Sequence, residues 1–454
     1  MVSQDRSATA YYLAELIERI RSARFSDEFR LIIRQHMLDA LASAFIGFRS
    51  STFQNLIRLC PQVRDGCSWP GGGKERIHPL DGAMAWSVAI NGSVFEDGSR
   101  EGACHPGAVV IPTILALAEG KDWEQIERAV VAGYDVMIRM ARGGNPEFTR
   151  RGFHPTAIVA PFGAAAAASF LLGYDPFRTQ NALCLAALGG AGLMTSFRSG
   201  ETQPLQVGWS VRSGMAAARI AGMGGAGYPK ILEEGFYPAY LGSQPRIPVD
   251  HPLEFEYAIQ GSYLKAYPGC RHVHPAIDAF DKILKEKAID FSRVEKIQVR
   301  TYRVAVETEI HDIHSRGDAY FNIPYALAAR AILGKTDWDA FGEEHFKNES
   351  LLEFMKKVNV MADPDWESQY PRQRGAGVEV FLKDGTVFSA KVNYALGEPE
   401  NPLPPDRTLE KFRSTAGKFL SPRMMERMES LLDVAGIDET AKSLFDALGE
   451  TVQK

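Results

Sequence analysis

The chain has 454 residues, of which 45% are hydrophobic and 24% charged, the balance of an ordinary folded protein. At roughly 100–200 residues per domain, this length predicts two to four domains. The 51 Lys and Arg against 56 Asp and Glu leave a net charge of −5. That balance argues against a nucleic acid partner and favours small-molecule chemistry.

The first half of the chain is predicted to be all-α. Apolar residues recur at three- and four-residue spacing, which is typical of helices with one buried face. Ser26 and Asp175 stand where N-caps are expected, and Pro176 fits the first turn after Asp175. The expected helices cover 11–23, 27–46, 82–95, 109–119, 123–142, 156–172, 175–193 and 207–223.

The character of the sequence changes near residue 250. Alternating β-formers predict a strand at 294–302 and a hairpin over 377–392 that turns at Asp384-Gly385, between helices at 275–287 and 323–333. After the proline-rich segment 398–405, residues 409–448 are predicted to be helical and to pack back on the first domain. We therefore expect an all-α domain at 1–264, a smaller α+β domain at 265–398, and returning C-terminal helices at 399–454.

Targeting and membrane signals are not evident. Charges throughout the N-terminal segment argue against a secretory signal, and five scattered cysteines without a C-x-x-C pair favour a reducing cytoplasm. The uncharged stretch 152–174 contains Pro155, Pro161 and many alanines, so we interpret it as a core helix and expect no membrane partner.

Several familiar site motifs can be set aside. Residues 222–227 match G-x-G-x-x-G, but they follow a helical run instead of a strand, which indicates a helix end and a turn. His272 and His274 lack the further ligands of a metal site, so no metal is expected. The chain has no G-x-S-x-G elbow, and no base is established for Cys270 as a nucleophile.

Histidines in turn-like settings form the strongest chemical signal. His105 and His154 each stand just before an apolar helix, and His272 and His274 follow a glycine turn. Each one alone is more often a structural histidine, but three clusters of similar design favour a site. Cations suited to a carboxylate ligand accompany them, although solvated surface positions are the plainer reading: Arg139, Arg151, Arg198, Lys265 and Arg271. Together these residues favour cofactor-free proton abstraction next to a carboxylate.

Five blocks in order along the chain carry a resemblance to a known family. They are Asn91-Gly92 with Glu96-Asp97 and His105-Pro106-Gly107; Gly133-Tyr134-Asp135-Val136 with Arg139; Arg151-Gly152-Phe153-His154 with Thr156; Lys265-Ala266-Tyr267-Pro268-Gly269-Cys270 with His274 and Asp278-Ala279; and Phe321-Asn322-Ile323-Pro324-Tyr325. This pattern resembles the MmgE/PrpD family over nearly the whole chain. The family includes 2-methylcitrate dehydratase, cis-aconitate decarboxylase and iminodisuccinate epimerase.

The resemblance implies a large helical domain, a smaller α+β lid, a homodimer, and a site between the domains that uses no cofactor. It places five catalytic residues at the site: His105, His154, Lys265, Tyr325 and, on an acidic loop, Asp97. Candidates for substrate binding are Tyr134, Arg139, Arg151, Gln203, Cys270, Arg271 and His274. Val94 and Gln203 depart from the decarboxylases, which carry Asp and Lys at the matching positions, and this disfavours strict cis-aconitate decarboxylase activity.

Three functional hypotheses follow from these residues. The first is a lyase that removes a proton next to a carboxylate of a small di- or tricarboxylate and then eliminates water, as 2-methylcitrate dehydratase does. In it His105 or His154 exchanges the proton, Lys265 and an arginine hold carboxylate, and Tyr325 donates. The second is an epimerase of an iminodisuccinate-like substrate, and the third is an oligomeric carboxylate-binding protein whose chemistry has decayed.

Overall fold

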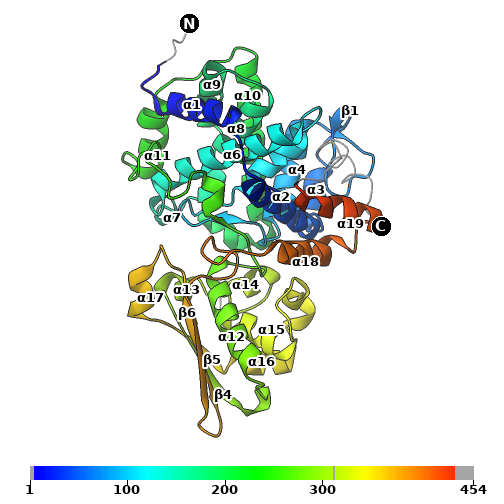
Figure 1. Cartoon of the computed structure of the whole chain (residues 1–454), viewed down its shortest axis with the longest axis vertical. Coiled ribbons are helices and arrows are strands. Elements are labelled where there is room, and N and C mark those ends of the chain that lie inside the picture. Colours follow the sequence, from blue (N-terminus) through cyan, green and yellow to red (C-terminus); the bar gives the residue numbers. More distant parts are fainter. Residues whose placement is uncertain (1–4, 310–311, 435–454) are drawn as a thin grey trace. The chain divides into compact units, whose positions relative to one another are not determined.

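A computed structural model describes residues 5–309 and 312–434, with the backbone alone at 198–201. The chain divides into two compact units, which we call the helical unit (Met1–Tyr263 with Pro405–Lys454) and the mixed unit (Leu264–Pro404) (Figure 1). The units change after residues 263 and 404, whereas the predicted domain boundaries follow residues 264 and 398.

The helical unit confirms the helices expected from the sequence, with shifted ends. Ser26 accepts a hydrogen bond from the Phe29 amide, and Asp175 accepts one from the Arg178 amide, so both predicted N-caps are present. The helices are α1 Thr9–Arg21, α2 Asp27–Gly47, α3 Ser51–Ile57, α4 Pro79–Asn91, α5 Gly107–Leu117, α6 Trp123–Gly144, α7 Glu147–Arg150, α8 Pro155–Leu171, α9 Pro176–Ala186, α10 Gln203–Gly222, α11 Tyr237–Leu241, α18 Pro405–Ala416 and α19 Pro422–Glu429.

Helix α8 is the centre of this unit, because every residue from Pro155 to Leu171 is buried. It packs against α5, α6, α9 and α10. Small side chains let the surrounding helices approach closely, which explains the alanine-rich composition of the uncharged stretch. Among the described residues no single helix is long and apolar enough to span a membrane; α2 and α3 meet that test only as a pair bent by 93°.

Two predictions for this unit need correction. The unit is not purely helical: it contains β1 (Gln62–Cys67) and a two-residue antiparallel pair of β2 (Gly98–Ser99) and β3 (Ser262–Tyr263). Strands β2 and β3 are too short for an alternating pattern to reveal them, and β1 is mostly polar and exposed, so it lacks an apolar face. The helix expected over 175–193 ends at Ala186, before Gly189 and Gly190. A side chain at Gly190 would lie 2.3 Å from the Ile158 carbonyl oxygen on α8, so only glycine fits there.

The glycines at 222–227 end a helix, as predicted. Helix α10 stops at Gly222, and Gly224 has a positive φ of 93°. That conformation suits a turn after a helix and differs from a strand-to-helix phosphate loop.

The C-terminal helix α18 packs on α2 through one face. Thr408, Lys411, Phe412 and Thr415 are buried there at helical spacing. The Gln35 amide donates to Thr408 Oγ1 at 3.3 Å, and the Phe412 ring meets Phe45 edge-on. Of the predicted helical stretch 409–448, residues 435–448 lie outside the described part of the chain.

The mixed unit has a four-stranded sheet in the order β5-β4-β6-β7, with α12 packed on β6 and β7. Strand β4 is parallel to β5 and antiparallel to β6, where Val299 pairs with Val378. Its elements are α12 His274–Glu286, β4 Val294–Thr301, α13 Arg303–Glu307, α14 Arg316–Ala319, α15 Ile323–Ile332, α16 Glu349–Met355, β5 Val358–Ala362, α17 Pro364–Gln369, β6 Ala376–Leu382 and β7 Val387–Val392. Movement of this unit as a lid stays a prediction.

The hairpin between β6 and β7 gives a clean test of turn chemistry. Gly385 has a φ of 86°, and an added side chain would meet nothing within 4 Å. Gly385→Ala should therefore destabilise the mixed unit by about 1 kcal/mol through backbone strain alone. Gly317→Ala, at an unstrained position in α14, is the control and should not destabilise. Urea denaturation of both variants measures the difference, and equal midpoints would contradict the assignment.

Candidate active site

The buried carboxylate of Asp97 organises the site loop of the helical unit. Asp97 Oδ2 accepts hydrogen bonds from His36 Nδ1 and from the Tyr134 hydroxyl, each at 2.7 Å. Asp97 Oδ1 accepts the amide of Gly107 at 2.8 Å, at the start of α5. Asp97 and Tyr134 are both predicted site residues, and the structure brings their side chains into contact.

Only glycine permits the approach of α5 to this carboxylate. A Cβ at Gly107 would lie 2.6 Å from Asp97 Oδ1 and 3.2 Å from the Tyr134 hydroxyl oxygen. Burial alone would raise the pKa of Asp97, but the hydrogen bonds from His36, Tyr134 and Gly107 outweigh burial and hold that pKa below its ordinary value. Asp97 is thus an ionised anchor whose oxygens already have donors. Its direct participation in proton transfer stays a prediction.

His105 follows this loop and is fixed by its backbone. Its Nδ1–H donates to the Asp97 carbonyl oxygen at 2.6 Å, and its amide donates to Thr156 Oγ1 at 3.2 Å. A carbonyl oxygen only accepts, so Nδ1 must carry the proton. In the neutral ring Nε2 then carries a lone pair instead of a proton, and the side chain is 26% exposed. His105 is therefore arranged to accept a proton at Nε2.

His154 caps the start of α8 and has the opposite arrangement. The amide nitrogen of Gln206, Nε2, lies 3.0 Å from His154 Nδ1 and donates to it. Since Nδ1 accepts, the neutral ring carries its proton on Nε2. Burial, aided by the charge on His105, lowers the pKa of His154 to about 3. His154 is thus a neutral imidazole that presents a donor at Nε2.

Gln206 determines this tautomer, and sequence reasoning did not single this residue out. Its Oε1 accepts the Leu193 amide at 2.8 Å, so the amide group can turn only Nε2 toward His154. That nitrogen also donates to Ser196 Oγ at 2.8 Å. Gln206 lies on α10 with no motif around it, and only the packing of α10 on α8 places it beside His154.

A neutral polar chain runs from Gln203 to the acidic loop. Gln203 Nε2 donates to Asn91 Oδ1, and Asn91 Nδ2 donates to Glu96 Oε1, each at 2.9 Å. Glu96 Oε1 lies 3.7 Å from His105 Nδ1. Val94, which precedes this loop, has a φ of 52°, a strained value for a β-branched residue. Both departures from the decarboxylase pattern thus bond to Asn91: Gln203 through its side chain and Val94 through its amide, which donates to the Asn91 carbonyl oxygen at 3.3 Å.

Of the predicted arginines of the helical unit, Arg139 has backbone partners. Arg139 Nη1 donates to the carbonyl oxygens of Val249 and His251, at 3.1 and 3.0 Å. Arg151 is exposed at the end of α7. The side chain of Arg198 lies outside the described part of the chain. A carboxylate-binding role for Arg139 or Arg151 stays a prediction, and the contacts of Arg139 show that it holds the segment 249–251.

In the mixed unit, Arg271 ties the loop that begins at Lys265 to residues 395–398. Its guanidinium pairs with Glu398 at 2.9 Å and donates to the carbonyl oxygens of Leu396 and Ala395. Arg271 Nη1 also lies 3.1 Å from His274 Nδ1. Arg271 and His274 therefore stabilise this loop, and substrate binding by either stays a prediction.

Lys265 and Cys270 lie on the same loop, and Lys265 is buried. Burial raises the pKa of the Cys270 thiol, opposed by the nearby charges of Lys265 and Arg374, so this cysteine keeps its proton. The Tyr325 hydroxyl donates to the Ala340 carbonyl oxygen at 2.8 Å, and burial raises its pKa. His272 contacts the Tyr302 hydroxyl instead of sharing a site with His274. The catalytic roles of Lys265 and Tyr325 stay predictions.

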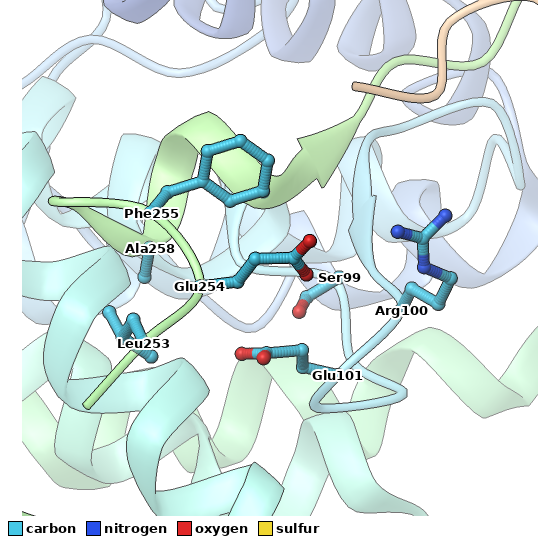
Figure 2. A pocket seen from close by; sticks show the side chains of 8 residues that line it. Ser99, Arg100, Glu101, Leu253, Glu254, Phe255 and Ala258 are labelled. Carbon is cyan, nitrogen blue, oxygen red and sulfur yellow. The ribbon is translucent and has the colours of Figure 1, made fainter. Parts of the chain in front are cut away.

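A pocket of the helical unit lies beside β2 but is unsuited to an anionic substrate. Figure 2 shows Glu101 and Glu254 extending into it, next to Ser99 and Phe255. Its lining sets two carboxylates against one guanidinium, that of Arg100, a balance that disfavours a polycarboxylate, and none of the predicted site residues lines this pocket. Among the described residues, no three His, Cys, Asp or Glu side chains are grouped as a metal site would require.

Comparison with known proteins decides the family. Residues 12–247 match the MmgE/PrpD N-terminal domain, and residues 267–434 match the MmgE/PrpD C-terminal domain. The chain belongs to the MmgE/PrpD family. The resemblance drawn from five short blocks is thereby confirmed.

Curated relatives from this family are cis-aconitate decarboxylases. The human enzyme is 26% identical over 440 residues, which cover 93% of this chain and 90% of the relative. The mouse enzyme is 25% identical, covering 93% and 88%, and that of Aspergillus terreus is 23% identical, covering 88% and 87%. This chain is similar to these MmgE/PrpD proteins along nearly their whole length.

The burial of His154 makes stability depend on pH. The folded protein holds this ring neutral down to a pKa of about 3, whereas the unfolded chain binds a proton below about 6.5. The free energy of unfolding should therefore fall by about 1.4 kcal/mol for each pH unit between 6.5 and 3 on account of this group. His154→Gln should remove that part of the loss.

Urea denaturation of the helical unit at pH 7.5 and pH 5.5 measures the effect. The wild type should lose about 1.4 kcal/mol more than His154→Gln between these two values. Burial likewise lowers the pKa of His272 to about 3, so His272→Gln is the matched variant in the mixed unit. Equal losses in the wild type and in His154→Gln would contradict a buried neutral imidazole.

Proposed function

We propose that this protein is a lyase that removes a proton next to a carboxylate of a small di- or tricarboxylate and then eliminates water, without a cofactor. The observation that carries this proposal is the pair of opposite tautomers at His105 and His154. One imidazole offers a lone pair at Nε2 and the other a donor at Nε2. An elimination needs both functions, a base for the C–H bond and donors for the developing negative charge.

In the proposed reaction His105 Nε2 takes the proton from the carbon next to the carboxylate. The electron pair of that C–H bond enters the carboxylate as an enediolate and returns to form the C=C bond. The C–O bond to the β-hydroxyl breaks, and the hydroxyl leaves as water with a proton from Tyr325. His105 then releases the proton that it took to solvent, and Tyr325 regains one from solvent. In this proposal Lys265 and an arginine hold the carboxylate, and Tyr325 donates the hydrogen bond or proton.

His154 is proposed to donate its Nε2–H to the carboxylate oxygen that gains charge in this step. A neutral imidazole is well suited to this role because it can share its proton without losing it. Burial of His154 and its acceptance of the Gln206 amide keep the donor in place as the reaction proceeds. Charge stabilisation of this kind needs no movement of the protein at the moment of reaction.

Decarboxylation is the second candidate, favoured by the names of the relatives. Loss of CO₂ breaks a C–C bond and leaves a carbanion, so the reaction needs a proton donor but no base for a C–H bond. In this chain the residue aligned by resemblance with the decarboxylase lysine is Gln203, whose amide already donates to Asn91. The tautomer of His105 and the neutrality of Gln203 therefore favour elimination.

The reaction can be identified by incubating the protein with citrate, 2-methylcitrate, cis-aconitate and an iminodisuccinate preparation in D₂O. A C=C product from a hydroxy acid, seen by ultraviolet absorbance and NMR, supports elimination. Release of labelled CO₂ from cis-aconitate supports decarboxylation instead. Deuterium incorporation with inversion and no new C=C bond supports epimerisation, and ligand-induced thermal stabilisation without any product supports a binding protein.

Substitution of the two histidines tests their separate roles. His105→Asn keeps a donor near the position of Nδ1 but removes Nε2, and His154→Asn removes the Nε2 donor. Each variant should lower kcat at least about 100-fold with unchanged folding, since one well-placed group contributes 10²–10⁴ in rate. His154→Gln, which places an amide nitrogen near the lost Nε2–H, should retain more activity than His154→Asn. His345→Asn, in the mixed unit, is the control, and near-wild-type turnover of His105→Asn would exclude His105 as the base.

A further inference from the structure

Two distant parts of the chain, α18 and α2, contact the loop that carries Asp97. Lys411 on α18 donates to the Phe95 carbonyl oxygen at 2.6 Å, and its Nζ lies 3.7 Å from the centre of the Phe95 ring. The same ammonium pairs with Asp39 Oδ1 on α2 at 2.5 Å. Lys411 therefore fixes the backbone two residues before Asp97.

His36 lies one turn before Asp39 on α2 and holds the next part of the loop. Its Nδ1 bonds to Asp97 Oδ2 at 2.7 Å, and its ring meets Tyr134 edge-on at 5.7 Å. The side chain is 3% exposed, so it cannot itself contact a substrate in solution. His36 and Lys411 both act on the segment whose Asp97 carbonyl oxygen accepts the proton of His105 Nδ1.

We propose that His36 and Lys411 are positioning residues that hold the base His105 in one tautomer through the loop 95–97. This inference rests on the proposed function of His105. The Asp97 side chain and the Asp97 carbonyl belong to one residue, so a donor that fixes the carboxylate also fixes the acceptor for His105. A small displacement of that carbonyl weakens the bond that keeps the proton on Nδ1.

Even a small displacement of the Asp97 carbonyl oxygen changes which tautomer His105 adopts. A neutral imidazole exchanges between two tautomers, and without a fixed acceptor at Nδ1 part of the population carries its proton on Nε2. Those molecules cannot take a proton from substrate. Misplacement of a catalytic group by about 1 Å also costs on the order of 100-fold in rate. Loss of His36 or Lys411 should thus lower kcat much more than it raises KM.

The experiment compares removal with conservative replacement at each position. His36→Leu removes the donor to Asp97, whereas His36→Asn can supply an amide nitrogen near the position of Nδ1. Lys411→Met removes the ammonium, whereas Lys411→Arg retains a cation. Thr408→Val is the matched control, because it removes a hydrogen bond between the same helices, α2 and α18, without touching the loop.

Two readouts are needed. Long-range ¹H–¹⁵N spectra of protein labelled with ¹⁵N-histidine report the His105 tautomer, assigned by loss of its signals in His105→Asn. Steady-state kinetics on the substrate identified above give kcat and KM. The wild type should show Nδ1–H with an unprotonated Nε2. His36→Leu and Lys411→Met should show mixed tautomers and a kcat lowered about 10- to 100-fold, with recovery in His36→Asn and Lys411→Arg.

The outcomes separate this inference from the proposed function. Mixed tautomers in His36→Leu, together with no lyase activity in the wild type, would support the positioning role and refute the reaction. A single wild-type tautomer and unchanged kcat in folded His36→Leu and Lys411→Met would overturn the positioning role while leaving the reaction intact. If Thr408→Val lowers kcat as much as Lys411→Met, the role of Lys411 is general packing and the inference fails for that residue. If the two removal variants fail to fold, a tautomer in His36→Asn and Lys411→Arg unlike that of the wild type would also overturn it.

Discussion

The burial of one carboxylate, that of Asp97, imposes the arrangement around the candidate site. A carboxylate removed from water is costly unless donors replace its hydration. Here the donors come from three helices: His36 on α2, Tyr134 on α6 and the amide of Gly107 at the start of α5. Those three elements must converge on a single loop for the charge to be tolerated. His105 leaves that loop directly before α5, so its position follows from the same requirement.

The C-terminal segment that returns to the helical unit also contacts the loop of Asp97. Residues 264–404 form the mixed unit, and α18 then adds a face to α2. Within the described residues, the cation paired with Asp39 is Lys411. The same ammonium donates to the Phe95 carbonyl oxygen in the site loop. Burial raises the pKa of Asp39, whereas Lys411 opposes that rise. A buried ion pair of this kind fixes geometry more than it adds stability, which suits a role in holding the site loop.

The sequence predicted local structure better than it predicted contacts. Helical spacing and the caps Ser26 and Asp175 located helices, and Asp384-Gly385 located a hairpin, because these signals act between near neighbours. Family blocks pointed to His105, His154 and Asp97. Gln206, His36 and Lys411 were missed, since their importance arises from packing between segments far apart in the chain. Arg139 and Arg271 suggested carboxylate binding by residue type, which stays a prediction; the structure shows their guanidinium groups donating to backbone carbonyl oxygens and, for Arg271, to Glu398.

Two identical side chains acquire different chemistry here from one neighbour each. A backbone carbonyl obliges His105 to keep its proton on Nδ1, and an amide nitrogen obliges His154 to keep its proton on Nε2. Neither assignment depends on the charge of a residue, so it persists over the pH range in which both rings are neutral. The amides of Gln203 and Asn91, which lead to Glu96, likewise add no cation near His105. A site built in this way can accept a proton at one imidazole while donating to developing charge at the other, which is the requirement of an elimination and exceeds that of a decarboxylation.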